Sequence, residues 1–404
     1  MSNPIPVPSY VRELKPALGP EVFRPVRARL AWLPAHLAII IAAAFAIASP
    51  QVPWPVAVLL SLVIGYCFGG LTFLGHEILH GAIVRGRRLR YAAGFVSYLP
   101  FVMSPRVWIA WHNRVHHGNT NEPGVDPDAN PTLAEHQRSL RVRIITDHFA
   151  LGRRSWTGPI GLLIGFSVQT AKVLVASRVW GYLTPREHRL AIAETAAGIA
   201  LWATVAAIVG PASFLLIFAL PLLVGNAIVM AFITTNHGLS PVHHARDPLL
   251  NSLTVTGPRW LSWLTLGFGF HVEHHLFPSM STRHAPRVRE LLRARWPERY
   301  QSLPLWRALL TMHRTARVYK NDVTLYDPRS HSEWPALAPR VAGACASTAS
   351  IPPTGTGQLT RRRSIPSPTR WPTTSTPTSA PGRSTAPTPS PHSAPSPTGS
   401  RPSA

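Results

Sequence analysis

Four apolar segments constrain the fold of this chain more than any other feature. They are residues 31–49, 54–74, 190–209 and 212–233. Roughly 20 mostly apolar residues are enough for a helix to cross the hydrocarbon core of a bilayer. The first two segments are joined by P-Q-V-P and the last two by Gly210-Pro211, links that leave room only for a turn. The sequence therefore predicts an all-α integral membrane protein with four transmembrane helices in two hairpins.

Two further apolar stretches, residues 91–103 and 158–177, are weaker because they are short or contain polar residues. Such stretches are more typical of re-entrant or interfacial helices than of helices that cross the bilayer. We therefore expect neither of them to span the membrane alone.

Eight histidines form three clusters that adjoin the apolar segments. They are His76 and His80 in H-E-I-L-H, His112, His116 and His117 in H-N-R-V-H-H, and His271, His274 and His275 in H-V-E-H-H. Residues four apart on an α-helix share a face, so the first cluster would present both rings to one side. In the second, His112 and His116 would share a face and His117 would be turned away by about 100°. The i, i+3, i+4 spacing of the third aligns all three rings.

This many imidazoles predict a metal site. Neutral imidazole is the commonest metal-ligand side chain, and eight nitrogens around one cavity would suit two ions with roughly three to five ligands each. Imidazole suits iron, copper, nickel or zinc, whereas magnesium and calcium prefer oxygen ligands. The spacing alone thus indicates a multi-histidine site and leaves the metal open.

The position of the clusters along the chain predicts the topology. One shared site requires all three clusters to lie on the same side of the bilayer, and two hairpins achieve this. The arginine-rich segments 85–90 and 138–154 fall on that side. Under the positive-inside rule this side is the cytoplasm, so we expect a cytoplasmic helical cap that holds the metal site.

The histidine motifs resemble those of a known superfamily. H-x-x-x-H, W-H-N-R-V-H-H-G-N-T-N and H-V-E-H-H-L-F-P, in this order over about residues 30–320, are similar to the three boxes of the membrane-bound fatty acid desaturases and hydroxylases. The resemblance implies a di-iron centre that uses O2 and two electrons to insert a cis double bond into a fatty acyl chain. The substrate would be a membrane lipid or an acyl thioester.

The resemblance also implies partners and further site residues. The chain has no H-P-G-G haem motif, so electrons would come from a separate ferredoxin-like or cytochrome b5-like donor and its reductase. A ninth nitrogen ligand is expected between the fourth span and the last box, where His237 is the first candidate and His243 and His244 are rivals. Asn236 could orient a ligand ring.

Other polar and aromatic residues near the boxes have two interpretations. The carboxylates could accept the second ring N–H of ligand histidines, or they could be ordinary solvated or capping groups. Asn226, Trp108, Trp111 and Trp263 could line an acyl tunnel, or they could form an interhelical hydrogen bond and an interfacial aromatic belt. The carboxylates concerned are Glu77, Asp126, Asp128 and Glu273.

Charge and composition bound the rest of the chain. The formal net charge is +23, but the arginines gather beside apolar runs and no nucleic-acid motif accompanies them, so we exclude nucleic acid as a partner. We expect a cytoplasmic N-terminal segment (1–30) without a cleaved signal peptide, a desaturase domain (31–320), an extension (321–344) and a disordered Pro/Ser/Thr/Ala-rich tail (345–404). The Arg-, Ala- and Pro-rich composition favours a bacterial inner membrane.

The sequence is also compatible with two alternative functions. H-E-I-L-H is also an HExxH zinc-protease motif, with Glu77 as the general base, but this leaves six box histidines unexplained. Hydroxylation of a lipid or alkane, or oxygenation of a carotenoid, would use the same scaffold. The H-H-L-F-P ending and the T-N sequence followed by Asp126 and Asp128 favour the desaturase branch.

Overall fold

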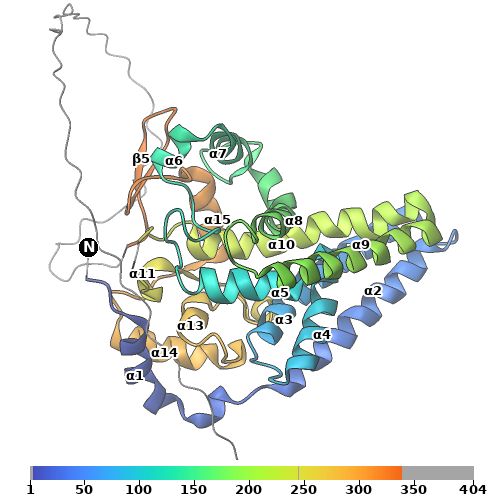
Figure 1. The fold of residues 1–404 in the computed structure, drawn as a ribbon, viewed down its shortest axis with the longest axis horizontal. Helices are drawn as coiled ribbons and strands as arrows, with labels where there is room; N and C mark the ends of the chain where they lie inside the picture. The colour runs from blue at the N-terminus through green and yellow to red at the C-terminus, as the bar shows by residue number, and fades with distance from the viewer. Residues whose placement is uncertain (1–2, 244, 339–404) are drawn as a thin grey trace, which may run out of the picture. The chain divides into compact units, whose positions relative to one another are not determined.

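Long apolar helices form one side of the computed structural model, which describes residues 3–243 and 245–338. Helix α2 (Trp32–Ala48) and helix α3 (Trp54–Leu79) run side by side and are joined by a short link (Figure 1). Helix α9 (Pro185–Phe214) continues through a π-helical turn, η6 (Leu215–Ala219), into α10 (Leu220–His237). The predicted disordered tail, 345–404, lies outside the described residues.

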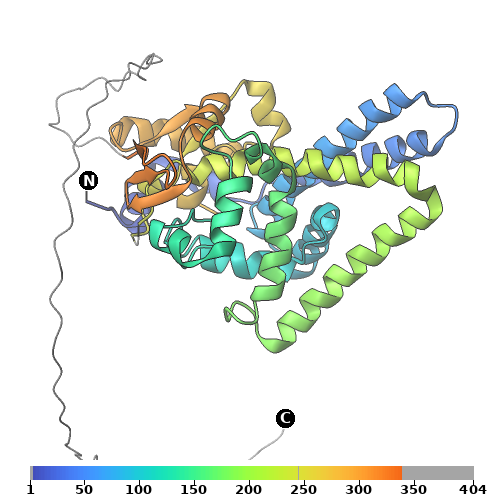
Figure 2. The same cartoon turned by 90° about the horizontal axis from the view of Figure 1, so that it is seen from above.

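The described residues contain four elements that are long and apolar enough to cross a membrane, but they differ from the four segments expected. These elements are Pro20–Ala48, Trp54–Leu79, Gly158–Ala176 and Pro185–His237. The segments 190–209 and 212–233 fall in one long element that bends at Gly210 (φ 77°, ψ 165°), a conformation open to glycine but strained for other residues. Figure 2 shows the two arms of this element diverging from the bend.

The other difference concerns residues 158–177, which we expected to be re-entrant or interfacial. They form one continuous helix, α8 (Gly158–Ala176), which meets the length and composition of a span. Figure 2 shows α8 crossing α10 rather than running alongside it. By contrast, the stretch 91–103 is broken into α4 (Arg87–Tyr98) and η3 (Leu99–Phe101).

Short elements complete the described chain and pack around the ends of α3 and α10. Five very short strands interrupt the expected all-α fold: β1 pairs with β2 in parallel, and β3, β4 and β5 form an antiparallel sheet. The remaining bounds are α1 (Val7–Leu18), η1 (Pro20–Phe23), η2 (Arg27–Ala31), α5 (Pro105–Trp108), η4 (Ile109–His116), α6 (Leu133–Arg138), α7 (Leu140–Ile144), η5 (Ile145–Phe149), α11 (Pro248–Asn251), β1 (Thr254–Thr256), α12 (Arg259–Leu264), α13 (His271–Leu276), η7 (Thr282–His284), α14 (Ala285–Arg295), β2 (Ser302–Pro304), α15 (Leu305–Arg314), β3 (Val318–Asn321), β4 (Thr324–Tyr326) and β5 (Glu333–Pro335).

The N-terminal segment is packed against the third histidine box. Tyr10, Leu14 and Leu18 of α1 are fully buried, in one apolar cluster with Val272 and Leu276 of α13. Tyr10 also donates a hydrogen bond to buried Asp247 (3.1 Å). Residues before the first apolar helix therefore help to cover the histidines rather than forming a free tail.

Small residues let α3 and α10 approach closely and in parallel. A Cβ atom on Gly65 would lie 2.5 Å from Cβ of Val224, and one on Gly69 would lie 3.0 Å from Ile228. Small residues four apart are a common device for close helix contact in membranes. Because both helices run in the same direction at this contact, their C-terminal ends lie together, which brings His76 and His237 to the same level.

Gly65→Leu should therefore disrupt this contact. The added side chain has to displace Val224, and overpacking of this kind costs about 1–3 kcal/mol. We expect a lower Tm for the detergent-purified protein and weaker metal retention. Val63→Leu enlarges a side chain that is 36% exposed on the same helix and is the control. An unchanged Tm in Gly65→Leu would contradict the role of this contact.

Candidate metal centre

Eight histidines from four elements, α3 with the residue that follows it, η4, α10 and α13, converge in two groups of four. Within each group, one ring nitrogen from every histidine lies within 4.8 Å of the others. The first group is His76, His80, His112 and His274, and the second is His116, His237, His271 and His275. The structure thus brings together all three boxes and His237.

The nitrogens in each group face one another at short range. Nε2 of His76 lies 3.0 Å from Nε2 of His112 in the first group. In the second, Nε2 of His271 lies 2.7 Å from Nε2 of His237 and 3.1 Å from Nε2 of His275. Two nitrogens bound at about 2.1 Å to one ion would be about 3.0–3.4 Å apart. The separations of 3.0 and 3.1 Å fit metal coordination, and that of 2.7 Å between His271 and His237 is shorter than this range.

The second box forms a π-helix, and this changes which rings share a side. Residues Ile109–His116 are π-helical, and the N–H of His117 bonds to the carbonyl of His112, five residues back (3.1 Å). A π turn brings residues five apart into line, so Nε2 of His117 lies 3.3 Å from Nε2 of His112. The rings of His112 and His116 stack (5.0 Å between centroids), as expected for a shared face, although the two belong to different groups. The correction concerns His117, which faces His112 instead of being turned away. Single π turns are frequent at functional sites.

His117 adjoins the first group without belonging to either set of four. Its Nε2 is 3.1 Å from Nε2 of His274, and its ring centroid is 4.4 Å from that of His275. Of the rivals to His237, His243 accepts a hydrogen bond from the Ala245 backbone on its Nδ1 (2.8 Å) and joins neither group. His244 lies outside the described residues.

The protonation of these rings suits metal binding. Burial, reinforced by neighbouring rings, holds the pKa of His80, His112, His117, His271, His274 and His275 well below the usual value, so they are neutral at pH 7. A neutral imidazole ring has one N–H donor. Hydrogen bonds between the rings therefore cannot provide a partner for every nitrogen that faces another. Among the described residues, Nε2 of His80 and Nδ1 of His76 and His271 are buried without a hydrogen-bond partner. A bound cation would use the facing lone pairs, so the donor set fits a metal.

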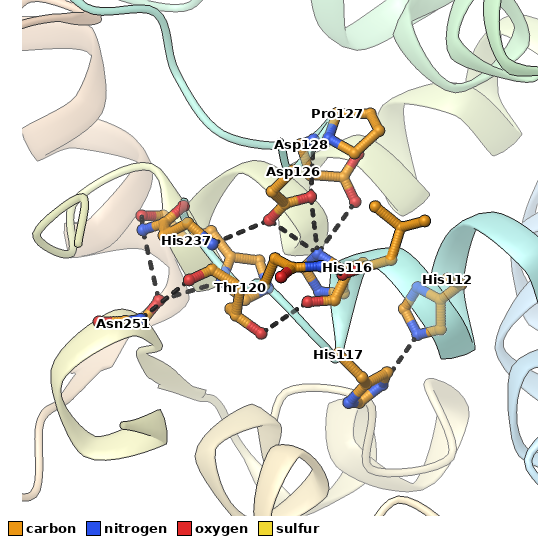
Figure 3. A network of polar contacts seen from close by, with 12 residues as sticks. His112, His116, His117, Thr120, Asp126, Pro127, Asp128, His237 and Asn251 are labelled. Carbon is orange, nitrogen blue, oxygen red and sulfur yellow. Dashed lines mark hydrogen bonds and ion pairs between the residues drawn. The ribbon is translucent and has the colours of Figure 1, made fainter. Parts of the chain in front are cut away.

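The second group has the better-defined outer contacts (Figure 3). Nδ1 of His116 lies 3.0 Å from Oδ2 of Asp126, and Asp128 approaches the same nitrogen at 3.5 Å. Burial lowers the pKa of His116, but Asp126 reverses this and leaves it raised. Asp126 therefore holds the proton on Nδ1 and turns Nε2 toward the group. The backbone carbonyl of Asn251 accepts from Nδ1 of His237 (3.2 Å), and Thr120 Oγ1 lies 3.3 Å from Nδ1 of His275.

Three predicted outer residues contact no box histidine through their side chains. Glu77 accepts from Arg29 (2.8 Å) and from Thr282 Oγ1 (2.5 Å), whereas Glu273 accepts from Tyr300 (2.5 Å) and Thr254 (2.7 Å). The amide of Asn236 is buried without a hydrogen-bond partner among the described residues. Each follows or precedes a histidine directly, and the helical rotation of about 100° per residue turns it to another face.

The Glu77 contacts identify residues that the motifs could not. Arg29, from the segment before the first apolar helix, bonds to Glu77, to Ser281 (3.0 Å) and to the Leu266 carbonyl (2.7 Å). Arg29 therefore links Glu77 of the first box to Ser281, which follows the third box. A single arginine in an arginine-rich segment gave no sequence signal for this contact.

A small apolar-walled cavity of about 30 Å³ lies between the groups. His76 and His112 of the first group and His116, His237 and His271 of the second border it. Trp108 and Trp111 form part of its wall, and Trp108 stacks on His112 (4.5 Å between centroids). Both groups thus face one apolar space.

Two of the residues expected to line a tunnel have other contacts. Trp263 is 63% exposed and packs against Trp32 (4.7 Å), as in an aromatic belt. The amide of Asn226 donates to Ser167 of α8 (2.9 Å) and accepts from its backbone N–H (2.9 Å). Asn226 therefore joins α10 to α8, the alternative interpretation of a polar residue in a span.

The structure thus combines helices long and apolar enough to cross a membrane with buried histidine groups that fit a metal site. Residues 53–305, more than half of the chain, match the Fatty acid desaturase family, and the chain belongs to this family of oxidoreductases. It is 21% identical over 338 residues to the chloroplastic omega-6 fatty acid desaturase of Spinacia oleracea, covering 80% of this chain and 72% of the relative. It is 24% identical over 335 residues to the sn-1 acyl-lipid omega-3 desaturase (ferredoxin) of Synechocystis sp., covering 75% of this chain and 86% of the relative.

The two histidine groups predict separable metal losses. His274→Ala removes a nitrogen from the first group and His275→Ala one from the second, so each variant should retain about one of two ions per chain. Elemental analysis of the purified proteins measures this. His148→Ala, at an exposed position, is the control. Full metal content in both variants would contradict the assignment.

The Arg29–Glu77 pair predicts a loss of stability that a second substitution relieves. Removing one partner of a buried ion pair costs about 3–5 kcal/mol because the other charge stays buried. Arg29→Met should therefore lower the Tm more than the double variant Arg29→Met/Glu77→Gln. Arg27→Met, at an exposed position in the same short helix, should have little effect. Equal Tm values for the single and double variants would show that Glu77 does not depend on Arg29.

Proposed function

We propose that this protein inserts a cis double bond into a fatty acyl chain, using O2 and two electrons at a di-iron centre. The observation that carries the proposal is the pair of four-histidine groups that face one apolar-walled cavity. All-nitrogen coordination suits iron, and an apolar space between two ions suits an unactivated alkyl carbon. Bound iron would supply the oxidant that removes hydrogen from this carbon.

In this proposal the protein's own residues bind and orient. His76, His80, His112 and His274 would hold one ion, and His116, His237, His271 and His275 the other, with His117 as a further ligand. Asp126 would fix the tautomer of His116, with Asp128 beside it. The Trp108 and Trp111 side chains would exclude water from the space that the acyl carbon occupies.

The membrane arrangement and electron supply are also part of the proposal. The parallel contact between α3 and α10, together with the bend at Gly210, supports two hairpins that carry all the histidines on one face, beneath a helical cap. Arginine-rich segments on that face favour the cytoplasm. The name of the Synechocystis relative includes ferredoxin, which supports an acidic ferredoxin-like donor that would complement the basic chain. A cytochrome b5-like donor is the alternative.

The contacts of Glu77 weigh against a zinc protease. The general base of an HExxH protease has to reach a metal-bound water, but the Glu77 carboxylate bonds to Arg29, Ser281 and Thr282. A hydroxylase on the same scaffold is the closer alternative, because insertion of a hydroxyl would need the same two histidine groups.

The decisive experiment is a mass-spectrometric lipid profile of cells that express the protein with a ferredoxin and its reductase. We expect a new double bond at one position, and its loss in His275→Ala because the second group is then incomplete. A new hydroxyl instead would identify the hydroxylase. Unchanged lipids with an iron-loaded, reduced wild type would contradict both oxidative functions.

A further inference from the structure

The structure contains a second, larger cavity that adjoins the metal centre. Its volume is about 860 Å³, within the roughly 300–1,000 Å³ typical of sites that enclose a small ligand. It shares Trp111, Asp128, Phe166, Ile233 and His237 with the wall of the small cavity between the histidine groups. An elongated apolar ligand in the large cavity would therefore end beside the second histidine group.

Exposed apolar side chains border this cavity on the outside. Val168 of α8 is 52% exposed, Ile145 of η5 is 47% exposed and Trp180 is 42% exposed, and all three line the cavity. Helix α8 is one of the elements long and apolar enough to lie in a membrane. Apolar residues that are both exposed and cavity-lining give the cavity an apolar rim, part of which belongs to α8.

The charges along the wall do not suit a carrier that is rich in phosphate. Two cations, Lys172 and Arg317, line the cavity with three carboxylates, Asp126, Asp128 and Glu135. Arg317 is buried and donates to the Gly238 carbonyl and to Thr315. Lys172 lies over the Trp180 ring (5.7 Å) and interacts electrostatically with Asp128. Three carboxylates and two cations that have partners of their own do not suit the several negative charges of coenzyme A.

From this geometry we propose that the substrate is the acyl chain of an intact bilayer lipid, which enters sideways between α8 and η5. This inference rests on the proposed function and specifies its carrier. The acyl chain would pass Val168 and Ile145 and follow the cavity to His237. The ester bond to the lipid stays intact, so no transfer step is needed.

Two arginine substitutions on α8 test the opening. Val168→Arg places a charge at the cavity, whereas Val175→Arg places one two helical turns away, at a residue that is 74% exposed and does not line the cavity. With wild-type protein in vesicles of stearoyl phosphatidylglycerol, iron and reduced ferredoxin, we expect an unsaturated lipid. The rate should fall at least tenfold in Val168→Arg and less than twofold in Val175→Arg, with equal iron content.

A binding measurement separates this inference from the proposed function. Vesicles that contain a diazirine-stearoyl phosphatidylglycerol should cross-link to peptides from residues 142–149 or 162–172, and excess stearoyl-CoA should not prevent this. Cross-links confined to other segments, or equal rates for the two arginine variants, would overturn the lateral opening. Conversion of stearoyl-CoA or a stearoyl-carrier protein but not of the lipid would overturn the carrier and leave desaturation intact. If no carrier yields a product, the proposed function fails, and the cross-links still show whether lipid occupies the cavity.

Discussion

The mutual approach of buried imidazole nitrogens is the constraint on which the rest of this structure depends. Nitrogens that face one another at 2.7–3.3 Å cannot all be hydrogen-bonded, because each neutral ring has a single N–H. A buried polar atom without a partner costs about 1–3 kcal/mol. Several such atoms in one place fit a metal site, and a bound cation would recover this cost.

The scaffold holds the rings by two different means. Close glycine contacts between α3 and α10 align the helix ends that carry His76 and His237. Apart from His80, which directly follows α3, the other rings lie on or next to short elements, and the boxes also depend on polar contacts farther out. Asp126 orients His116, Glu273 is held by Tyr300 and Thr254, and Glu77 ties the first box to the loop after the third. These carboxylates are buried, so the position of each one depends on its hydrogen-bond partner.

The sequence predicted that the histidine boxes come together, but not which histidines form each group of four. Spacing within a box is local, and the structure brings all eight box histidines and His237 together as expected. The position of His117 beside His112 follows from a π-helix, which a rule of 100° per residue misses. Glu77 and Glu273 were expected either to accept from ligand histidines or to be solvated or capping groups. They bond instead to Arg29 and Tyr300, which come from distant segments that only tertiary packing brings near.

For the apolar segments too, the sequence predicted some features of the fold and missed others. Hydropathy identified α2 and α3 and located the turn at Gly210-Pro211, because these depend on composition and on one glycine conformation. It could not assign α8, since a helix of this length can lie within a bilayer or along its surface. The contacts of α8 bear on this choice: Ser167 bonds to Asn226 on α10, while Val168, the next residue, is exposed beside the large cavity. A helix that packs on the core through one residue and borders the cavity with the next forms a wall of the site, whichever way it meets the membrane.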